Sequence, residues 1–154
     1  MQITIKPSPT ADTRTCDWSK VTETELLIAS LMHKQDIAKG IGFFQTLLTE
    51  AAVRHDHDKL HAIGHFHSDF RTGFKEHSWW DNHRAVNRHH LTMADGIPED
   101  VNLIDVLDYI ADCVMSGMAR SGSVYDITLP PELLAKAFAN TTELLKAAVT
   151  VDRS

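Results

Sequence analysis

Residues 101–118, VNLIDVLDYIADCVMSGM, are the stretch that decides the fold. Apolar side chains recur there every three to four residues, as on one face of an α-helix: Leu103, Ile104, Leu107, Ile110, Ala111, Val114, Met115 and Met118. Pro98, Glu99 and Asp100 are typical of a first helical turn, and Gly122 is typical of a helix end. The stretch therefore predicts an amphipathic helix with a broad apolar face.

A second long helical pattern lies upstream, over residues 24–55. Either Thr22 or Thr24 is expected to cap this helix, and Thr22, followed three residues later by Glu25, has the spacing of a capping box. Gly40 and Gly42 weaken its middle, so we expect either a kink there or two consecutive helices.

The segment between these two patterns has weaker periodicity. It predicts a helix at 61–74, a turn at 76–81, a short helix at 82–90 and a loop at 93–98. In a helix, the adjacent residues His89 and His90 would point to different sides, so at most one of them is expected to be a direct metal ligand.

The two ends of the chain complete the expected architecture. Residues 1–20 predict an extended arm in which Ile3 and Ile5 form a short strand, and residues 131–150 predict a C-terminal packing helix. The fold class is therefore predicted to be all-α, a compact bundle of about five to six helices in a single domain over residues 1–154.

Composition narrows the classes of function. The formal net charge is −6, which argues against general nucleic-acid binding. Cys16 and Cys113 lack the spacing of a disulfide framework or a cysteine zinc site. No apolar run is long enough for a signal peptide or a membrane span, so we expect a cytoplasmic protein. The sequence does not determine the oligomeric state, and a homodimer is one alternative.

Histidine is the anomaly of this sequence. Nine of the ten histidines lie between His55 and His90, and only His33 lies outside. In His55-Asp56, an imidazole and a carboxylate stand side by side, and together they suit divalent Mn, Fe, Co, Ni or Zn. Other helices must complete such a site.

Two sets of residues could complete it, and each has an ordinary alternative. His33 lies on the apolar stripe of its helix, where a histidine is commonly a core residue. Asp105, Asp108 and Asp112 share one side of the 101–118 helix, which is also the pattern of a solvated acidic face.

In chain order, these residues resemble the HD-domain metal-dependent phosphohydrolases. The signature of that superfamily is a His, then a His-Asp pair, then a later Asp on a helix, and here it reads His33, His55-Asp56, Asp112. The sequence is more similar still to a small phage-associated HD-like group. The elements shared with that group are His55-Asp56…Lys59, His83…Asn87-Arg88-His89-His90 and Asp108…Asp112.

The resemblance implies a helical bundle with one or two divalent ions, Mg being a further candidate. The first ion would be held by His33, His55, Asp56 and Asp112. A second ion would be held by His83 with His89 or His90.

It also implies roles around the ions. Lys59, Arg84 and Arg88 would anchor phosphate, and Asp108 is a further substrate-binding candidate. Asp58 would be either a general base or the group that orients a ligating histidine. A shifted register, with His57-Asp58 as the ligand pair, stays open.

The predicted function is hydrolysis of a nucleotide or another small phosphorylated substrate by metal-activated water. Two alternatives remain. One is an HD-type di-iron oxygenase. The other is a non-catalytic phage module that binds a nucleotide or a host protein. If the chain is encoded by a phage, the expected location is the host cytoplasm.

Overall fold

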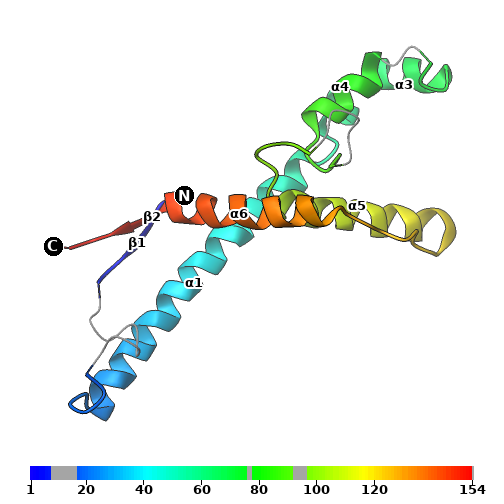
Figure 1. Cartoon of the computed structure of the whole chain (residues 1–154). Coiled ribbons are helices and arrows are strands. Elements are labelled where there is room, and N and C mark those ends of the chain that lie inside the picture. Colours follow the sequence, from blue (N-terminus) through cyan, green and yellow to red (C-terminus); the bar gives the residue numbers. More distant parts are fainter. Residues whose placement is uncertain (8–16, 76–77, 92–96, 154) are drawn as a thin grey trace. The chain divides into compact units, whose positions relative to one another are not determined.

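The computed structural model describes residues 1–7, 17–75, 78–91 and 97–153 (Figure 1). These residues form six helices and two short strands: β1 (Ile3–Ile5), α1 (Glu23–Arg54), α2 (His57–His61), α3 (Ile63–Arg71), α4 (Ser78–Val86), α5 (Leu103–Ser121), α6 (Pro131–Ala148) and β2 (Val149–Val151). The all-α class is therefore confirmed. Among the described helices, none is long and apolar enough to cross a membrane.

The chain divides into two compact units. The first comprises Met1–Thr46 and Glu143–Ser154, and the second comprises Leu47–Thr142. Helices α1 and α6 each begin in one unit and end in the other. Each unit is described by itself below, and the single domain stays a prediction.

In the first unit, the two ends of the chain pair as parallel strands (Figure 1). Ile3 lies opposite Val149, so the predicted strand at Ile3 and Ile5 is confirmed. The predicted extension of the last helix to residue 150 is wrong, because α6 ends at Ala148. The β-branched residues that follow it favour the strand over the helix.

Helix α1 begins as the sequence predicts. The Thr22 N–H donates to Glu25 Oε2 over 2.8 Å, and the Glu25 N–H donates to Thr22 Oγ1 over 3.2 Å, which confirms the capping box. The alternative of two consecutive helices is wrong, because α1 continues through Gly40 and Gly42. Glycine lowers helix propensity but keeps its backbone donor and acceptor, so it does not by itself end a helix.

The core of the second unit lies between α5 and the first part of α6. Its buried residues are Leu91, Val101, Val106, Leu133 and Ala137. Polar contacts hold the same elements together, since Thr141 Oγ1 accepts from the Leu103 N–H over 2.8 Å and Asn140 donates to the carbonyl of Val101 over 2.7 Å. Both contacts fix the start of α5 against α6.

Helix α5 begins later than the sequence predicts. Asn102 is its N-cap and forms a capping box with Asp105, so the predicted first turn at Pro98, Glu99 and Asp100 is wrong. Two orphan N–H groups of the helix bind the Asn102 side chain, which is the physical reason for the later start. The predicted end is confirmed, because Gly122 has a left-handed φ of 70°.

The segment between the long helices differs most from its prediction. Residues 78–81, expected in a turn, open α4. The buried carboxylate of Asp69 accepts from the N–H groups of Trp79 and Trp80 and so caps this helix. Helix α4 ends at Val86, so the predicted helix over 82–90 is too long.

Some predictions fall on parts of the chain that the structure leaves undescribed. These are Cys16 with most of the arm after residue 7, residues 76–77 of the predicted turn, and residues 92–96, which include most of the predicted loop.

Candidate metal centre

The centre is built around the carboxylate of Asp56, in the second unit. Asp56 joins α1 to α2 and has a left-handed backbone, with φ 52° and ψ 23°. Aspartate is one of the few residues with a side chain that adopts this conformation readily. The Asp56 N–H donates to Asn87 Oδ1 over 3.0 Å, which holds the turn in place.

Three imidazole nitrogens face this carboxylate. His83 Nε2 lies 3.4 Å and His89 Nε2 lies 3.7 Å from Asp56 Oδ1, and His55 Nε2 lies 3.6 Å from Asp56 Oδ2. Ligand atoms about 2.1 Å from one ion lie roughly 3.4 Å apart in a tetrahedral shell. The separations from Asp56 are therefore close to those between ligands of a metal ion. Ligand atoms lie within 4.8 Å of one another in the two groups His55–Asp56–His89 and Asp56–Asp58–His83. We call Asp56 and the three histidines that face it, His55, His83 and His89, the candidate metal centre.

The far nitrogens of two of these histidines are held by carboxylates. His83 Nδ1 lies 2.9 Å from Asp58 Oδ2, and His55 Nδ1 lies 2.8 Å from Asp108 Oδ1. His89 Nδ1 lies 3.8 Å from Asp108 Oδ2, beyond hydrogen-bond distance. A carboxylate on Nδ1 fixes the tautomer and presents Nε2 to a metal, as second-shell carboxylates commonly do.

Buried atoms without a partner mark the same place. Within the described part of the chain, Asp56 Oδ1, His89 Nδ1 and His90 Nε2 are buried and have no hydrogen-bond partner. A buried carboxylate oxygen is costly to leave without a hydrogen bond or a cation. A bound cation would remove this cost, so the residues present fit a metal ion.

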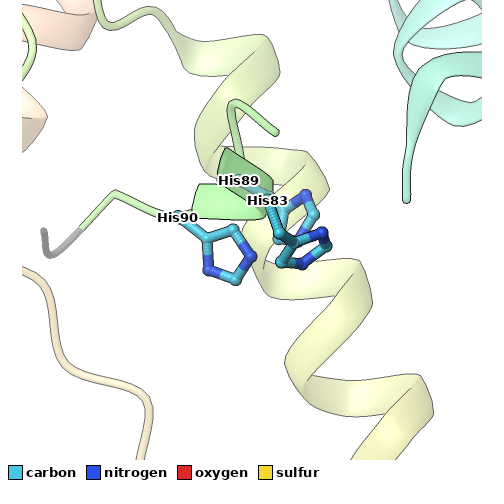
Figure 2. A group of neighbouring side chains, drawn as sticks. All are labelled: His83, His89 and His90. Carbon is cyan, nitrogen blue, oxygen red and sulfur yellow. The ribbon is translucent and has the colours of Figure 1, made fainter. Parts of the chain in front are cut away.

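His89 and His90 follow α4 in a turn and are not on a helix. Their ring centroids lie 4.3 Å apart, and the His90 ring centroid lies 4.8 Å from that of His83 (Figure 2). The premise that the two side chains point to different sides of a helix is therefore wrong. The turn brings both of them to His83, and the three form one of the groups that could hold an ion.

The charges of the centre suit metal binding. Burial and the neighbouring histidines lower the pKa of His90 to about 4, and burial with the nearby His55 also lowers the pKa of His89. Burial raises the pKa of Asp56, but the hydrogen bond and charge of Lys59, together with the charges of His55 and His83, lower it by more. A neutral imidazole at His89 and an ionised carboxylate at Asp56 are the forms that bind a metal.

Asp58 serves His83 and Asn87. Burial raises the pKa of Asp58, but hydrogen bonds from Asn87 and His83 lower it by more. A carboxylate held ionised by two donors is a weak proton acceptor near neutral pH. Of the two predicted roles, these contacts favour the orienting one.

Asn87 is the residue whose role the sequence did not predict. Its Nδ2 donates to Asp58 Oδ1 over 2.7 Å and to the carbonyl of His83 over 3.0 Å, while its Oδ1 accepts from Asp56. Asn87 thus ties the Asp56 turn to the Asp58–His83 pair. The sequence carries one sign of this role, because Asn87 belongs to the same motif as His89 and His90.

Arg88 does not contact the centre as a free cation. Its guanidinium binds Asp105 through two hydrogen bonds of 2.7 Å and Asp100 Oδ2 over 2.9 Å. Asp105 is only 5% exposed, so the acidic-face alternative is wrong for this residue. In this structure Arg88 is a clasp between the turn after α4 and the start of α5, and its role as a phosphate anchor stays a prediction.

The two other predicted phosphate anchors, Lys59 and Arg84, are each bound to an aspartate. Lys59 Nζ hydrogen-bonds to Asp56 Oδ2, and Arg84 binds Asp81 over 2.8 Å. His57 Nδ1 lies 2.9 Å from the carbonyl of Arg54 instead of facing the centre. The contacts favour the register in which His55-Asp56 is the ligand pair.

Asp112 and His33 are the two other predicted ligands of the first ion. Asp112 Oδ1 lies 3.9 Å from His55 Nε2, so it borders the centre. His33 is exposed on α1 in the first unit and belongs to none of the potential ligand groups of the described residues. Its role as a ligand stays a prediction.

No protein-family model, curated protein or solved structure matches this chain. The candidate metal centre is therefore defined by its own residues and by the three side chains that hold them, Asp58, Asp108 and Asn87.

Proposed function

We propose that the chain is a metal-dependent phosphohydrolase that acts on a nucleotide or another small phosphate ester. The observation that carries the proposal is the convergence of three histidine Nε2 atoms on Asp56, whose buried Oδ1 has no hydrogen-bond partner among the described residues. The order of these residues along the chain, with Asp112 at the margin, supports the reaction through the resemblance described above.

The donor set selects among metals. Three imidazoles and one carboxylate suit Mn, Fe, Co, Ni or Zn, whereas Mg and Ca prefer oxygen ligands. When bound, such an ion would supply positive charge for phosphate oxygens and acidify a water. We therefore expect activity with Mn or Co to exceed activity with Mg.

Side chains of the protein supply positive charge and hold the imidazole ligands in a fixed orientation. Lys59, which binds the Asp56 carboxylate, is the cation that we assign to the phosphate of the substrate. Asp58 and Asp108 keep the imidazoles oriented before a substrate arrives. A centre that is ordered in advance loses less free energy when ligand binds.

The test is phosphate release from nucleoside mono- and triphosphates under Mn, Co and Mg. The expected result is metal-dependent release that a chelator abolishes and that Asp56→Asn loses. Asp126→Asn, an exposed carboxylate distant in sequence from the centre, is the matched control and should keep full activity. A wild-type protein that binds no transition metal at neutral pH would overturn the proposal.

A di-iron oxygenase is the second candidate, and one observation favours it. His83, His89 and His90 offer ligand atoms within 4.8 Å of one another, so the described residues include a second possible ligand group next to the first. Oxygen consumption by the iron-loaded protein would support this candidate. Intact nucleotide after long incubation with several metals would instead support a binding module.

A further inference from the structure

Helix α1 carries a second apolar face, opposite its buried one. Ala29 and Phe43 are the buried apolar residues of this helix. Leu27 and Ile41 each lie two residues before one of them, which places them about 200° away around the helix. Leu27 is 58% and Ile41 is 53% exposed. A helix with apolar side chains on all sides is normally buried, so we expect the second face to be covered in the working protein.

The exposed residues of this face repeat with the spacing of a coiled coil. They follow one another at alternating intervals of four and three residues, as positions a and d of a heptad do, and we call them the α1 stripe: Leu27, Leu31, Lys34, Ala38, Ile41, Gln45 and Leu48. Every one of them is exposed, and only Lys34 and Gln45 are polar. Because α1 is one unbroken helix, the stripe is continuous along it.

The polar positions select the direction and the register of a pairing between two copies of the stripe. In a parallel pair, Lys34 would face Lys34 of the second copy, and like charges would meet. In an antiparallel pair, each a residue faces a d residue. One antiparallel register then sets Lys34 against Gln45 of the second copy, whereas a shift by one heptad in either direction sets Lys34 against Ala38 or Ala52.

The register that pairs Lys34 with Gln45 also fits the apolar positions. Ile41 faces Ala38 of the second copy, so a large side chain meets a small one. Leu31 faces Leu48 of the second copy. Each of these pairs occurs twice, related by a twofold axis, because both copies present the same residues. The α1 stripe is therefore complementary to itself, which is what an isologous twofold interface requires.

We propose that the α1 stripe binds the same stripe of a second copy of this chain, as an antiparallel pair of helices in a homodimer. A second copy is the occupant because the stripe itself supplies both partners of every pair, polar with polar and apolar with apolar. The inference is independent of the proposed function. No residue of the stripe belongs to the candidate metal centre, so the dimer should form without metal.

The test is the oligomeric state of the full chain in the presence of a chelator, measured by sedimentation equilibrium. The wild type should be a dimer at micromolar concentration. Ile41→Glu should raise the Kd of the dimer by at least about 100-fold, because it brings a carboxylate into an apolar interface. Ala38→Glu, which removes no large apolar side chain, should have the same effect. Both positions are exposed, so circular dichroism should show the helix content of the wild type.

Val53→Glu is the matched control, because Val53 is an apolar residue of α1 that is 76% exposed and lies outside the stripe. This variant should dimerise like the wild type. A monomeric wild type would overturn the proposal, and so would a dimer that both Ile41→Glu and Ala38→Glu leave intact.

Gln45→Glu tests the antiparallel direction. The new carboxylate would face Lys34 of the second copy, so the Kd of the dimer should fall by about two- to tenfold. In a parallel pair, the two new carboxylates would instead face each other, and the Kd would rise. A weaker dimer in Gln45→Glu would therefore overturn the antiparallel pairing.

Discussion

At single residues, the sequence predicts ligand types better than it predicts their partners. His55-Asp56 could be selected because two good metal donors are adjacent and Lys59 follows at a fixed distance. For Asp58 the sequence leaves two roles open, and only its contacts with His83 and Asn87 favour one of them. The role of Asn87 could not be derived, because it depends on the hydrogen bond between the left-handed turn at Asp56 and the residue that follows α4. Local sequence does not encode that hydrogen bond.

Asp58→Asn should lower metal affinity by about 10- to 100-fold, the usual effect of losing a carboxylate that orients a ligating histidine. The amide keeps the shape but does not hold His83 in the required tautomer. Competition with a chromogenic chelator measures the change. Asp126→Asn should leave affinity as in the wild type, and an equal loss in both variants would contradict the orienting role.

The metal-free protein should lose stability as the pH falls from 6.5 towards 4. His90 has a folded pKa of about 4 and an ordinary value of 6.5. In that window the unfolded chain binds a proton that the folded chain does not, so protonation favours unfolding. Above pH 6.5 this residue is neutral in both states and has no effect.

Urea denaturation in the presence of a chelator, at several pH values, measures this dependence. His90→Gln should reduce it and leave the part due to His89, whose pKa is also lowered, whereas His65→Gln, at an exposed position on α3, should leave it unchanged. The same slope in the wild type and in His90→Gln would show that His90 is not the group responsible.

At the scale of elements, periodicity predicts the long helices and fails where caps come from a distance. Helices α1 and α5 follow repeating apolar positions and local caps. Helix α4 is capped by Asp69, which lies on α3 about ten residues before the capped N–H groups, and no local pattern indicates that. The predicted helix over 82–90 is longer than α4, because the hydrogen bonds of Arg88 to Asp105 hold residues 88–89 in a turn.

Asp105→Asn should lower the free energy of unfolding by about 2 kcal/mol, because it leaves a guanidinium without its buried partner. Asp100 binds the same guanidinium, but its side chain is 75% exposed. Asp100→Asn should therefore cost less than about 1 kcal/mol. Urea denaturation measures both values, and equal costs would contradict the clasp between the turn and α5.

At the scale of the whole molecule, the all-α class could be predicted, and the division into two units could not. Helical periodicity carries straight through α1 and α6, so nothing in the pattern marks where one unit ends. The pairing of β1 with β2 joins residues about 146 positions apart and has no local signal either. His33 is predicted to be a ligand because of its place in the order of the motif. The order of residues along a chain does not specify how far apart they lie in space.

Metal should stabilise the fold through the candidate metal centre. Ligand at 100 times its Kd stabilises a protein by about 2.7 kcal/mol, which raises Tm by several degrees. A thermal melt of the wild type with Mn, Co or Zn should show this shift. Asp56→Asn should melt at one temperature with or without metal, and an undiminished shift in that variant would exclude Asp56 as a ligand.

Elemental analysis of the purified protein after loading with a transition metal and desalting, comparing His55→Gln with His57→Gln, tests the centre most directly. The two histidines are two positions apart, but only His55 faces Asp56, and His57 contacts a backbone carbonyl. We predict that the wild type and His57→Gln retain bound metal and that His55→Gln loses it. Equal metal content in the two variants, or loss in His57→Gln alone, would contradict a centre built on His55 and Asp56.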